Sequence, residues 1–558
     1  MALPTMTQTS SVQQTPVVIV GAGPVGLALA GDLGWRGISC ILIERGDGQV
    51  FQPRMDMVGI RTMEFCRRWG LVPAVEASPY PRDYAQDNIY LTNLTGHELG
   101  RERFPGIGQA PPPKESPQRR ERCPQNMFDP ILRSFAASQK TVEMRYRTRL
   151  ISFTQDAERV TAVIENADTG TREEIFARYI VGCDGARSLV RETLGIAMHG
   201  NPVLTYTTNV IFRCPNLLSL HDKGKAYRHI LIGPEGTWST IVAINGRDEW
   251  RFSIIGGAEQ REYSHDEIGA LIRRAVGRDF EFEILSVLPW TRRELVADSY
   301  RNGRGLIAGD AVHVMSPTGG FGMNTGIQDA VDLSWKLAAM LEGWGGDGLL
   351  DSYGIERRPI GTRNVAEASS NLRRMLSVAP HPELLDDTPE GAAVRKKVGR
   401  EFSEAMRHEW FTLGAHLGYR YEDSPICWPD DSEAPPDNPR NYVPTARPGH
   451  RAPHAYLPDG RSTLDLFGRG FTLLGFNKSA EEAEPLLAAA REREVPISFV
   501  TITDPQIAAL YQCNYVLVRP DGHVAWRDDR MPEDALCIID VVRGAQDRCS
   551  LSQTRRAG

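Results

Sequence analysis

Three glycines, Gly21, Gly23 and Gly26, have the spacing Gly-x-Gly-x-x-Gly, which lets a tight turn approach a phosphate group closely. Backbone N–H groups at the start of a helix bind the pyrophosphate of a dinucleotide where larger side chains would block it. Glu44 ends the next apolar run, where a carboxylate accepts a hydrogen bond from an adenosine ribose hydroxyl. The glycine pattern also occurs in tight helix–strand crossings, but its context and Glu44 favour a nucleotide site. An acid here disfavours a 2′-phosphate, so the site suits FAD or NAD over NADP.

The elements that must position this site form a βαβ unit. Residues 16–20 (PVVIV) and 38–44 (ISCILIE) are nearly all apolar, as strands buried on both faces of a parallel sheet are. The glycine-rich turn and a helix lie between them. Later apolar runs at 179–182 and 305–308 return to the same sheet. The pattern predicts an α/β fold with a Rossmann-like, doubly wound domain.

Two further motifs stand at the ends of those later runs. The chain reads GCDGARS over 182–188 and GDAVH over 309–313. The three motifs, in this order, resemble those of the flavoprotein aromatic hydroxylases, the group A flavoprotein monooxygenases. The resemblance implies that FAD occupies the first site, that Asp184 and Gly185 lie near its pyrophosphate and the nicotinamide path, and that Asp310 contacts the ribityl chain and pyrophosphate region.

A glycine-rich run that begins at Pro317 (PTGGFGMNTG) resembles the family's segment at the flavin ring. The resemblance implies that Gly320, Gly322 and Asn324 present backbone donors to the isoalloxazine. Met323, which lies between the last two, is a further predicted FAD contact. Such donors would favour negative charge on the reduced ring.

The segment from Pro53 to Leu71 is similar to that of phenol hydroxylase-type members of the family. The resemblance implies that Arg54 lies near the flavin. It also places Asp56 five residues before an Arg-Thr pair, where those enzymes carry Asp or His. A carboxylate in a dry pocket could accept the phenol proton and activate the ortho and para carbons. Asp56 also suits a structural role, as the cap of a helix that begins near Gly59.

Gln125 joins the expected cofactor contacts, because CPQNMFDPIL over 123–132 resembles a further segment of the family. The full set of predicted FAD contacts is Gly21, Gly23, Pro24, Gly26, Glu44, Arg45, Arg54, Gln125, Asp184, Gly185, Asp310, Pro317, Gly320, Gly322, Met323 and Asn324.

Residues 200–298 contain short β-rich runs separated by glycine and charged residues, which predict an inserted antiparallel sheet that roofs the substrate. Candidate substrate contacts in this region are Tyr227, His229, Trp238 and Trp290. Most aromatic rings in a sheet pack the core, so each of the four has that second interpretation. Three arginines there could pair with a substrate carboxylate or lie exposed on strands: Arg213, Arg228 and Arg251.

No metal site is expected. His313 follows Asp310 by three residues, but no carboxylate cluster accompanies it, and the family commonly has His beside the flavin. The C-terminal region resembles the thioredoxin-like extension of phenol hydroxylases and polyketide-tailoring hydroxylases. It lacks Cys-x-x-Cys, so we expect a role in packing or dimer contacts.

The predicted organisation has five parts. These are a disordered tail (1–15), an FAD-binding domain (16–199 and 299–424), an inserted β-rich substrate domain (200–298), a proline-rich linker (425–450) and a thioredoxin-like C-terminal domain (451–558).

The composition excludes several classes of partner. A net charge of −7 over 558 residues gives no sustained attraction to nucleic acid or to an anionic membrane. The N-terminal residues lack the apolar region of a signal peptide, and no run of about 18 apolar residues follows. We expect a cytoplasmic enzyme that binds a small aromatic substrate and O2. A homodimer is compatible with the sequence.

These features predict a flavin-dependent monooxygenase that hydroxylates a phenolic or related aromatic substrate. The resemblance implies that NADH or NADPH is a transient cosubstrate and that the reaction passes through a flavin hydroperoxide. Two alternatives remain open. One is an oxygenase that tailors a larger polyketide or heteroaromatic ring, including by a Baeyer–Villiger route. The other is a flavin reductase that makes no oxygenated product.

Overall fold

A computed structural model describes residues 13–546, and an eight-stranded sheet lies at its centre. Five of its strands are parallel, and across the sheet they run in the order β17 (Gly305–Ile307), β10 (Arg172–Gly182), β1 (Gln13–Val20), β2 (Cys40–Ile43) and β7 (Val142–Arg145). A short edge strand, β16 (Arg301–Asn302), and a hairpin of β8 (Thr148–Gln155) and β9 (Val160–Asn166) complete the sheet. The structure confirms the predicted α/β class.

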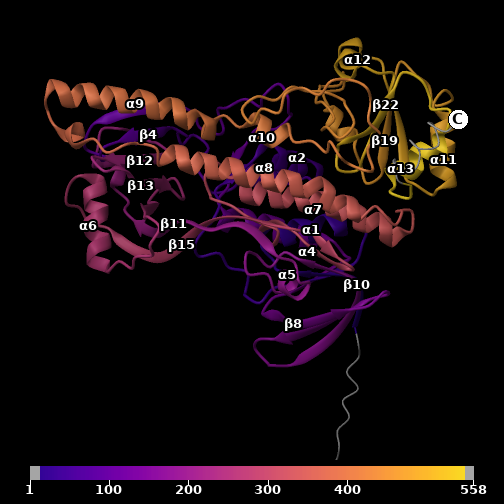
Figure 1. The fold of residues 1–558 in the computed structure, drawn as a ribbon, viewed down its shortest axis with the longest axis horizontal. Coiled ribbons are helices and arrows are strands. Elements are labelled where there is room, and N and C mark those ends of the chain that lie inside the picture. Colours follow the sequence, from indigo (N-terminus) through magenta and orange to yellow (C-terminus); the bar gives the residue numbers. More distant parts are fainter. Residues whose placement is uncertain (1–12, 547–558) are drawn as a thin grey trace, which may run out of the picture.

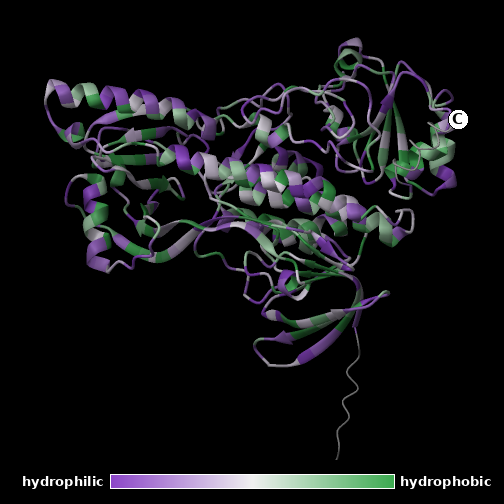
Figure 2. Cartoon of the chain, viewed as in Figure 1, coloured by the Kyte–Doolittle hydropathy of each residue, from purple (hydrophilic) through white to green (hydrophobic). Residues whose placement is uncertain are grey.

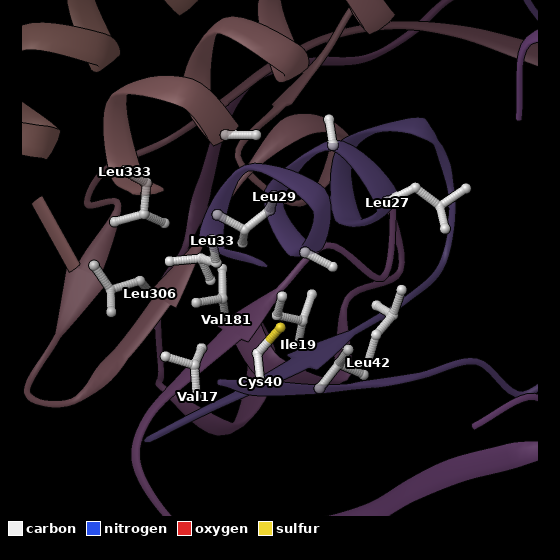
Figure 3. Close-up of a cluster of buried hydrophobic side chains, with 14 of the residues drawn as sticks. Val17, Ile19, Leu27, Leu29, Leu33, Cys40, Leu42, Val181, Leu306 and Leu333 are labelled. Carbon is white, nitrogen blue, oxygen red and sulfur yellow. The ribbon is translucent and has the colours of Figure 1, made fainter. Parts of the chain in front are cut away.

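Helix α1 (Pro24–Trp35) packs between α4 (Gln125–Ser138) and α7 (Phe321–Glu342) on this sheet (Figure 1). Figure 3 shows Leu27, Leu29 and Leu33 of α1 in one cluster of buried apolar side chains with residues of the strands, and Leu33 lies beside Val181 of β10. Because apolar residues fill both the helix and the strands, burial of their surface stabilises the layer at about 25 cal/mol per Å². The carboxyl ends of the parallel strands are therefore held at one edge of the sheet.

The second sheet is mainly antiparallel and gathers strands from distant parts of the chain. Its order is β18 (His313–Val314), β15 (Glu283–Ala297), β11 (Met198–Arg213), β14 (Glu249–Ile255), β13 (Gly236–Ala243), β12 (Arg228–Gly233), β4 (Asn88–Leu91) and β5 (Glu98–Glu102). Helix α6 (His265–Val276) covers one face. The other face packs in part against α8 (Asp351–Met375) and α9 (Pro389–Trp410).

This sheet differs from the predicted insertion in its limits. Strands β4 and β5 lie within 16–199, which was expected to belong to the FAD-binding part, yet β4 pairs with β12. Sequence periodicity does not reveal which sheet a short strand joins, since pairing partners are chosen by tertiary packing. Residues 13–15 of the expected tail already belong to β1, and residues 1–12 lie outside the described chain.

A third, four-stranded sheet follows the proline-rich segment. Its order is β20 (Ile497–Ile502), β19 (Phe471–Phe476), β21 (Tyr515–Val518) and β22 (Val524–Asp528). Helices α11 (Glu484–Glu492) and α13 (Ala535–Val542) cover one face, and α12 (Pro505–Tyr511) lies on the other. Figure 2 shows hydrophobic residues along these strands and α13. Trp335 of α7 shares their core, which joins this unit to the first sheet.

The three longest helices, α7, α8 and α9, pack against the sheets of the protein. Helix α7 has 22 residues, α8 has 25 and α9 has 22. Figure 2 shows hydrophilic and hydrophobic residues interspersed along α8 and α9. Among residues 13–546, no helix combines the length and the apolar composition needed to cross a bilayer.

A buried ionic cluster ties α7 and α8 to the third sheet. Arg519, which follows β21, is fully buried and pairs with Asp332, Glu356 and Asp521. Lys336 pairs with the first two of these carboxylates. Burial opposes ionisation of Glu356, but Arg519 and Lys336 outweigh it and hold the pKa of Glu356 near 2. Glu356 is therefore ionised at neutral pH, whereas burial raises the pKa of its neighbour Asp332 to about 7.

Arg519→Met tests the contribution of this cluster to stability. The substitution leaves three buried carboxylates with one lysine, and breaking such a cluster typically costs about 3–5 kcal/mol. We expect a melting temperature lower by several degrees in a thermal unfolding scan. The matched control is Arg491→Met, which removes an exposed pair with Glu484 and should change stability by less than about 1 kcal/mol. Equal melting temperatures for the two variants would show that the cluster contributes no net stability.

Candidate active site

The glycine-rich turn forms a cradle between β1 and α1. Gly21 has φ +101°, and a Cβ at Gly26 would stand 1.9 Å from the carbonyl oxygen of Gly21. These two positions exclude any side chain. A Cβ on Gly23 would meet nothing within 4 Å, so the space before the first N–H groups of α1 is open. Pro24 begins α1, where its missing N–H removes no helical hydrogen bond. The turn therefore fits a pyrophosphate at a helix N-terminus.

Glu44 is fixed beside this cradle. Its Oε2 accepts a hydrogen bond from the backbone N–H of Ala22 at 2.9 Å, and its Oε1 accepts from Gly46 N–H at 2.8 Å. The carboxylate is half-buried and keeps lone pairs for a ribose hydroxyl. Arg45 follows it and is exposed. The end of β2 thus offers the acceptor that a nucleotide ribose requires.

Asp310 lies in the turn after β17, and its carboxylate makes no hydrogen bond to another described residue. The turn itself is held from beneath by Asp329 of α7. Oδ2 of Asp329 accepts from Gly309 N–H at 3.2 Å and from His313 Nε2–H at 2.8 Å, while Oδ1 accepts from Arg357. Burial opposes ionisation of Asp329, but Arg357 and His313 lower its pKa. His313 therefore helps to hold the turn through its hydrogen bond to Asp329. The described residues contain no cluster of His, Cys, Asp or Glu that could hold a metal ion.

Asp184 holds its own loop. Its carboxylate accepts from Ser188 Oγ at 2.5 Å and from Val190 N–H at 3.2 Å, at the start of α5 (Leu189–Thr193). Burial raises the pKa of Asp184. Gly185 has φ +83° with open space before it. The structure places both residues at the carboxyl end of β10, beside Gly21, whose Cβ would strike Cys183.

The N-terminus of α7 faces the same edge. Gly320 is its N-cap, with φ +67°, and Gly322 and Met323 in the first turn are half-buried. The first-turn N–H groups have no helical acceptor and remain available to a ligand. Pro317, in the preceding turn, is exposed. The N-terminus of α7 therefore has N–H groups that could donate to a ligand.

The side chain of Asn324 is fully occupied. Its Oδ1 accepts from Gly59 N–H at 2.8 Å and from Thr62 Oγ1 at 2.7 Å. Its Nδ2 donates to the carbonyl groups of Met57 and Gly320. Asn324 thus ties α7 to α2 (Ile60–Arg68) and leaves only its backbone for a cofactor.

Arg54, Gln125 and Trp290 come together above this edge. Gln125 Oε1 accepts from the backbone N–H of Arg54 at 3.1 Å. The guanidinium of Arg54 lies 5.4 Å from the centroid of the Trp290 ring, on β15. A cation over an indole ring is favourable. One predicted substrate contact therefore borders the predicted cofactor contacts.

Asp56 does not cap the helix that follows it. Helix α2 has Gly59 as its N-cap and no side-chain capping bond. Instead, Asp56 Oδ1 accepts from Arg122 at 2.8 Å, and Oδ2 accepts from Tyr227 Oη at 2.5 Å and from Arg251 at 3.2 Å. Burial opposes ionisation, but Arg122 and Arg251 lower the pKa of Asp56. The capping interpretation is therefore wrong, and Asp56 is an ionised acceptor.

His229 and Trp238 point away from Asp56. His229 and Phe252 both pair with Ile241, so His229 lies on the face opposite Arg251. A β-bulge between Thr237 and Ser239 turns Trp238 to that same face. Trp238 packs on Phe252, with centroids 6.2 Å apart, and under Arg274 of α6. His229 is fully buried against His221. The structure does not bring either to the site, which corrects their assignment as substrate contacts. Burial explains them as core residues.

Several polar residues of the site were missed by the sequence analysis. Arg120 is half-buried, stacks over Phe104 and has no hydrogen bond to a described residue. Arg292 is buried, donates to Thr207 from Nε and leaves Nη1 without a partner. Burial lowers the pKa of each to about 10. Nothing in the local pattern marks them, because both face the site only through the fold.

Glu409, at the end of α9, links the second sheet to the loop before α7. Its Oε1 accepts from Arg228 at 2.8 Å and from Gly319 N–H at 3.1 Å. Arg213, by contrast, pairs with Glu249 and Glu283 at the far end of β11 and is half exposed. Of the three arginines expected to meet a carboxylate, only Arg228 and Arg251 lie near Asp56.

Comparison with known proteins agrees with this geometry. Residues 14–368 match the family model described as an FAD binding domain, and residues 445–539 match the aromatic-ring hydroxylase C-terminal domain. The chain is 33% identical to the tetracenomycin B2 monooxygenase-dioxygenase of Streptomyces olivaceus, over 95% of this chain and 98% of that protein. It is 33% identical to the 4-methyl-5-nitrocatechol 5-monooxygenase of a Burkholderia species, over 95% and 97%.

The solved structures include RebC soaked with chromopyrrolic acid. The TM-score is 0.89 at 39% sequence identity, over 96% of this chain and all of that one. The first family model covers more than half of the chain and specifies FAD, and the two relatives each cover 95% of the chain. The chain belongs to the FAD-dependent aromatic-ring hydroxylases, a family of flavoprotein monooxygenases.

Proposed function

We propose that this enzyme hydroxylates an aromatic ring that carries a phenolic hydroxyl and an acidic group, with NADH or NADPH as reductant and O2 as cosubstrate. The excess of guanidinium groups around Asp56 and Tyr227 carries the proposal. Five arginines lie near two carboxylates there: Arg122, Arg228 and Arg251 interact with Asp56, Arg228 and Arg292 interact with Glu409, and Arg120 lies near Arg122 and Tyr227. An anionic substrate would balance this charge.

In this proposal, the cradle of Gly21, Gly23 and Gly26 binds the FAD pyrophosphate, and Glu44 binds the adenosine ribose. Asp310 has free lone pairs for the ribityl chain, and the first-turn N–H groups of α7 face the ring. FAD, when bound, supplies electron transfer from the nicotinamide and activation of O2. The side chains of the site orient the substrate and accept its proton.

Tyr227 and Asp56 form a path for the substrate proton. Tyr227 donates to the ionised Asp56, so its hydroxyl oxygen has a lone pair free to accept a phenol proton. Burial raises the pKa of Tyr227, which keeps it neutral and able to donate. As the substrate hydroxyl gives its proton to Tyr227, the tyrosine proton moves to Asp56. Loss of the phenol proton enriches the ring carbons in electrons and favours attack on oxygen.

The relatives agree with both features of the proposed substrate. The Burkholderia relative acts, by its name, on a nitrocatechol, which is phenolic, and RebC was soaked with an acid. The Streptomyces relative acts on tetracenomycin B2. A panel of acids and neutral phenols with one or several rings would define the size of the substrate.

Gly23→Val tests the cofactor cradle. The backbone of Gly23, with φ −73°, accepts valine without strain, and the side chain would project into open space. We expect a folded protein that purifies without the flavin absorption band, because the side chain occupies the pyrophosphate position. Gly257→Val, also in open space but in a loop after β14, should retain FAD. A yellow, FAD-loaded Gly23→Val protein would disprove the cradle.

Tyr227→Phe and Asp56→Asn test the proton path. Each should keep FAD and lower kcat for a phenolic substrate by about 10²-fold or more, since a positioned proton acceptor is lost. Because Arg122 and Arg251 lower the pKa of Asp56, it stays ionised from pH 8 down to pH 5. The wild-type rate should therefore not fall with an Asp56 titration in this range. Tyr206→Phe on β11 is the control. Wild-type kcat in both site variants would refute the path.

Arg292→Met tests the charge of the substrate. We expect KM to rise at least about tenfold for an aromatic acid and to change little for the matching neutral phenol, because only the acid loses an ion pair. Nicotinamide oxidation and product yield provide the measurements. Arg213→Met, which alters a distant exposed arginine, should leave both KM values unchanged. An equal rise for acid and phenol would contradict an anionic substrate.

A further inference from the structure

A second cavity lies away from the candidate active site, between α2 and the C-terminal unit. Its volume is about 270 Å³, which approaches the size of small-ligand pockets and exceeds that of a few water molecules. Its walls are formed by Trp35, Arg61, Glu64, Phe65, Arg67, Arg68, Leu464, Asp465, Phe467, Gly468 and Gly522. The comparisons assign nothing to these residues.

Two of the three arginines in this cavity are already paired. Arg61 binds Glu64, the carbonyl group of Asp521 and the hydroxyl of Tyr419. Arg67 makes two parallel hydrogen bonds of 2.7 Å to Asp465 at the partly exposed rim. The positive charges of Arg61 and Arg67 are therefore already paired with carboxylates of the protein.

Arg68 has no such partner. Among the described residues it makes no ion pair and no hydrogen bond, and its Nη1 is buried and unsatisfied. Burial lowers the pKa of Arg68 to about 10, so it is charged at neutral pH. An unsatisfied buried cation is costly, and native proteins normally pair it. The cavity therefore contains one uncompensated positive charge.

The carboxylates nearest to Arg68 are committed elsewhere. Asp32 accepts from Arg36, from Trp69 Nε1 and from Ser334. Asp521 accepts from Arg519 through both oxygens and from the backbone of His523. They attract Arg68 from a distance without binding it. A ligand that enters the cavity would not compete with an internal ion pair.

The other walls are flat and apolar. Trp35 of α1 and Phe65 of α2 line the cavity together with Leu464 and Phe467 of the C-terminal unit, and the guanidinium of Arg68 lies 5.7 Å from the centroid of the Phe65 ring. Glu64 and Asp465 also border the space, and their charges would repel an anion that carries two or more negative charges. The lining fits a planar apolar molecule with a single negative charge.

We propose that this cavity is a binding site for a small aromatic carboxylate, which pairs its carboxylate with Arg68 and packs its ring between Phe65 and Phe467. The site is distinct from the candidate active site. Helix α2 separates the two, because Gly59 at its N-terminus contacts Asn324, whereas Arg68 lies nine residues, or about 13.5 Å, further along the helix axis.

Calorimetric titration of the FAD-loaded enzyme with benzoate tests the proposal, with benzyl alcohol as the neutral comparison. We expect benzoate to show a binding event that benzyl alcohol lacks. Arg68→Met should weaken this event at least tenfold, whereas Arg461→Met, an exposed arginine in the same unit, should not. If benzoate also enters the active site, Arg292→Met removes that event and leaves the one that depends on Arg68.

Stability separates a ligand site from a structural role. Since Arg68 has no hydrogen bond or ion pair to lose among the described residues, Arg68→Met without benzoate should melt at or above the wild-type temperature. Leu464→Trp, which fills the cavity from the opposite wall, should also abolish the event and guards against local damage at α2. Benzoate binding that neither variant weakens would overturn the proposal. So would a melting temperature of Arg68→Met that falls as far as that of Arg519→Met.

Discussion

The close approach of α1 to the edge of the parallel sheet governs the rest of the architecture. Side chains are excluded at Gly21 and Gly26, and Val25 occupies the space where a Cβ on Gly309 or Gly326 would lie. Helix α1, the turn after β17 and helix α7 therefore meet at backbone distance. Because of this contact, the turn after β1, the turn after β17 and the N-terminus of α7 form one continuous surface. This surface presents backbone N–H groups and the carboxylate of Asp310, which are groups that can bind the pyrophosphate and ribityl parts of FAD.

The proposed proton path at Asp56 depends on a different kind of contact. Asp56 receives hydrogen bonds from Arg122, Tyr227 and Arg251, which come from three distant segments. The arginines make ionisation of a buried carboxylate favourable, and the ionised carboxylate in turn orients the tyrosine hydroxyl. Glu409 extends this order to the loop before α7. The second sheet and the N-terminus of α7 are thus coupled by hydrogen bonds to charged groups, which are stronger than neutral ones.

Charge is distributed unevenly over the buried interfaces. At the junction of α7, α8 and the third sheet, Arg519 and Lys336 are surrounded by carboxylates, and the cluster is internally paired. Arg451 and Arg61 likewise saturate Glu64. Against this background of matched pairs, the unmatched guanidinium groups stand out: Arg120 and Arg292 near Tyr227, and Arg68 in the second cavity. A protein interior retains such groups where something else supplies the opposite charge.

The sequence alone was sufficient for the dinucleotide-binding turn, the buried strands and the order of the motifs, because each depends on local spacing: glycine where a Cβ cannot fit, apolar runs where both faces are buried. It also singled out Asp56, although two roles were open. Only the tertiary structure decided between them, by placing Arg122 and Tyr227 on the carboxylate and leaving Gly59 to begin α2. In the tertiary structure, His229 and Trp238 lie in the core, and Arg120 and Arg292 lie near Tyr227 and Glu409. Long-range pairing decides which face of a strand meets the site, and sequence periodicity carries no information about which partner lies across that face.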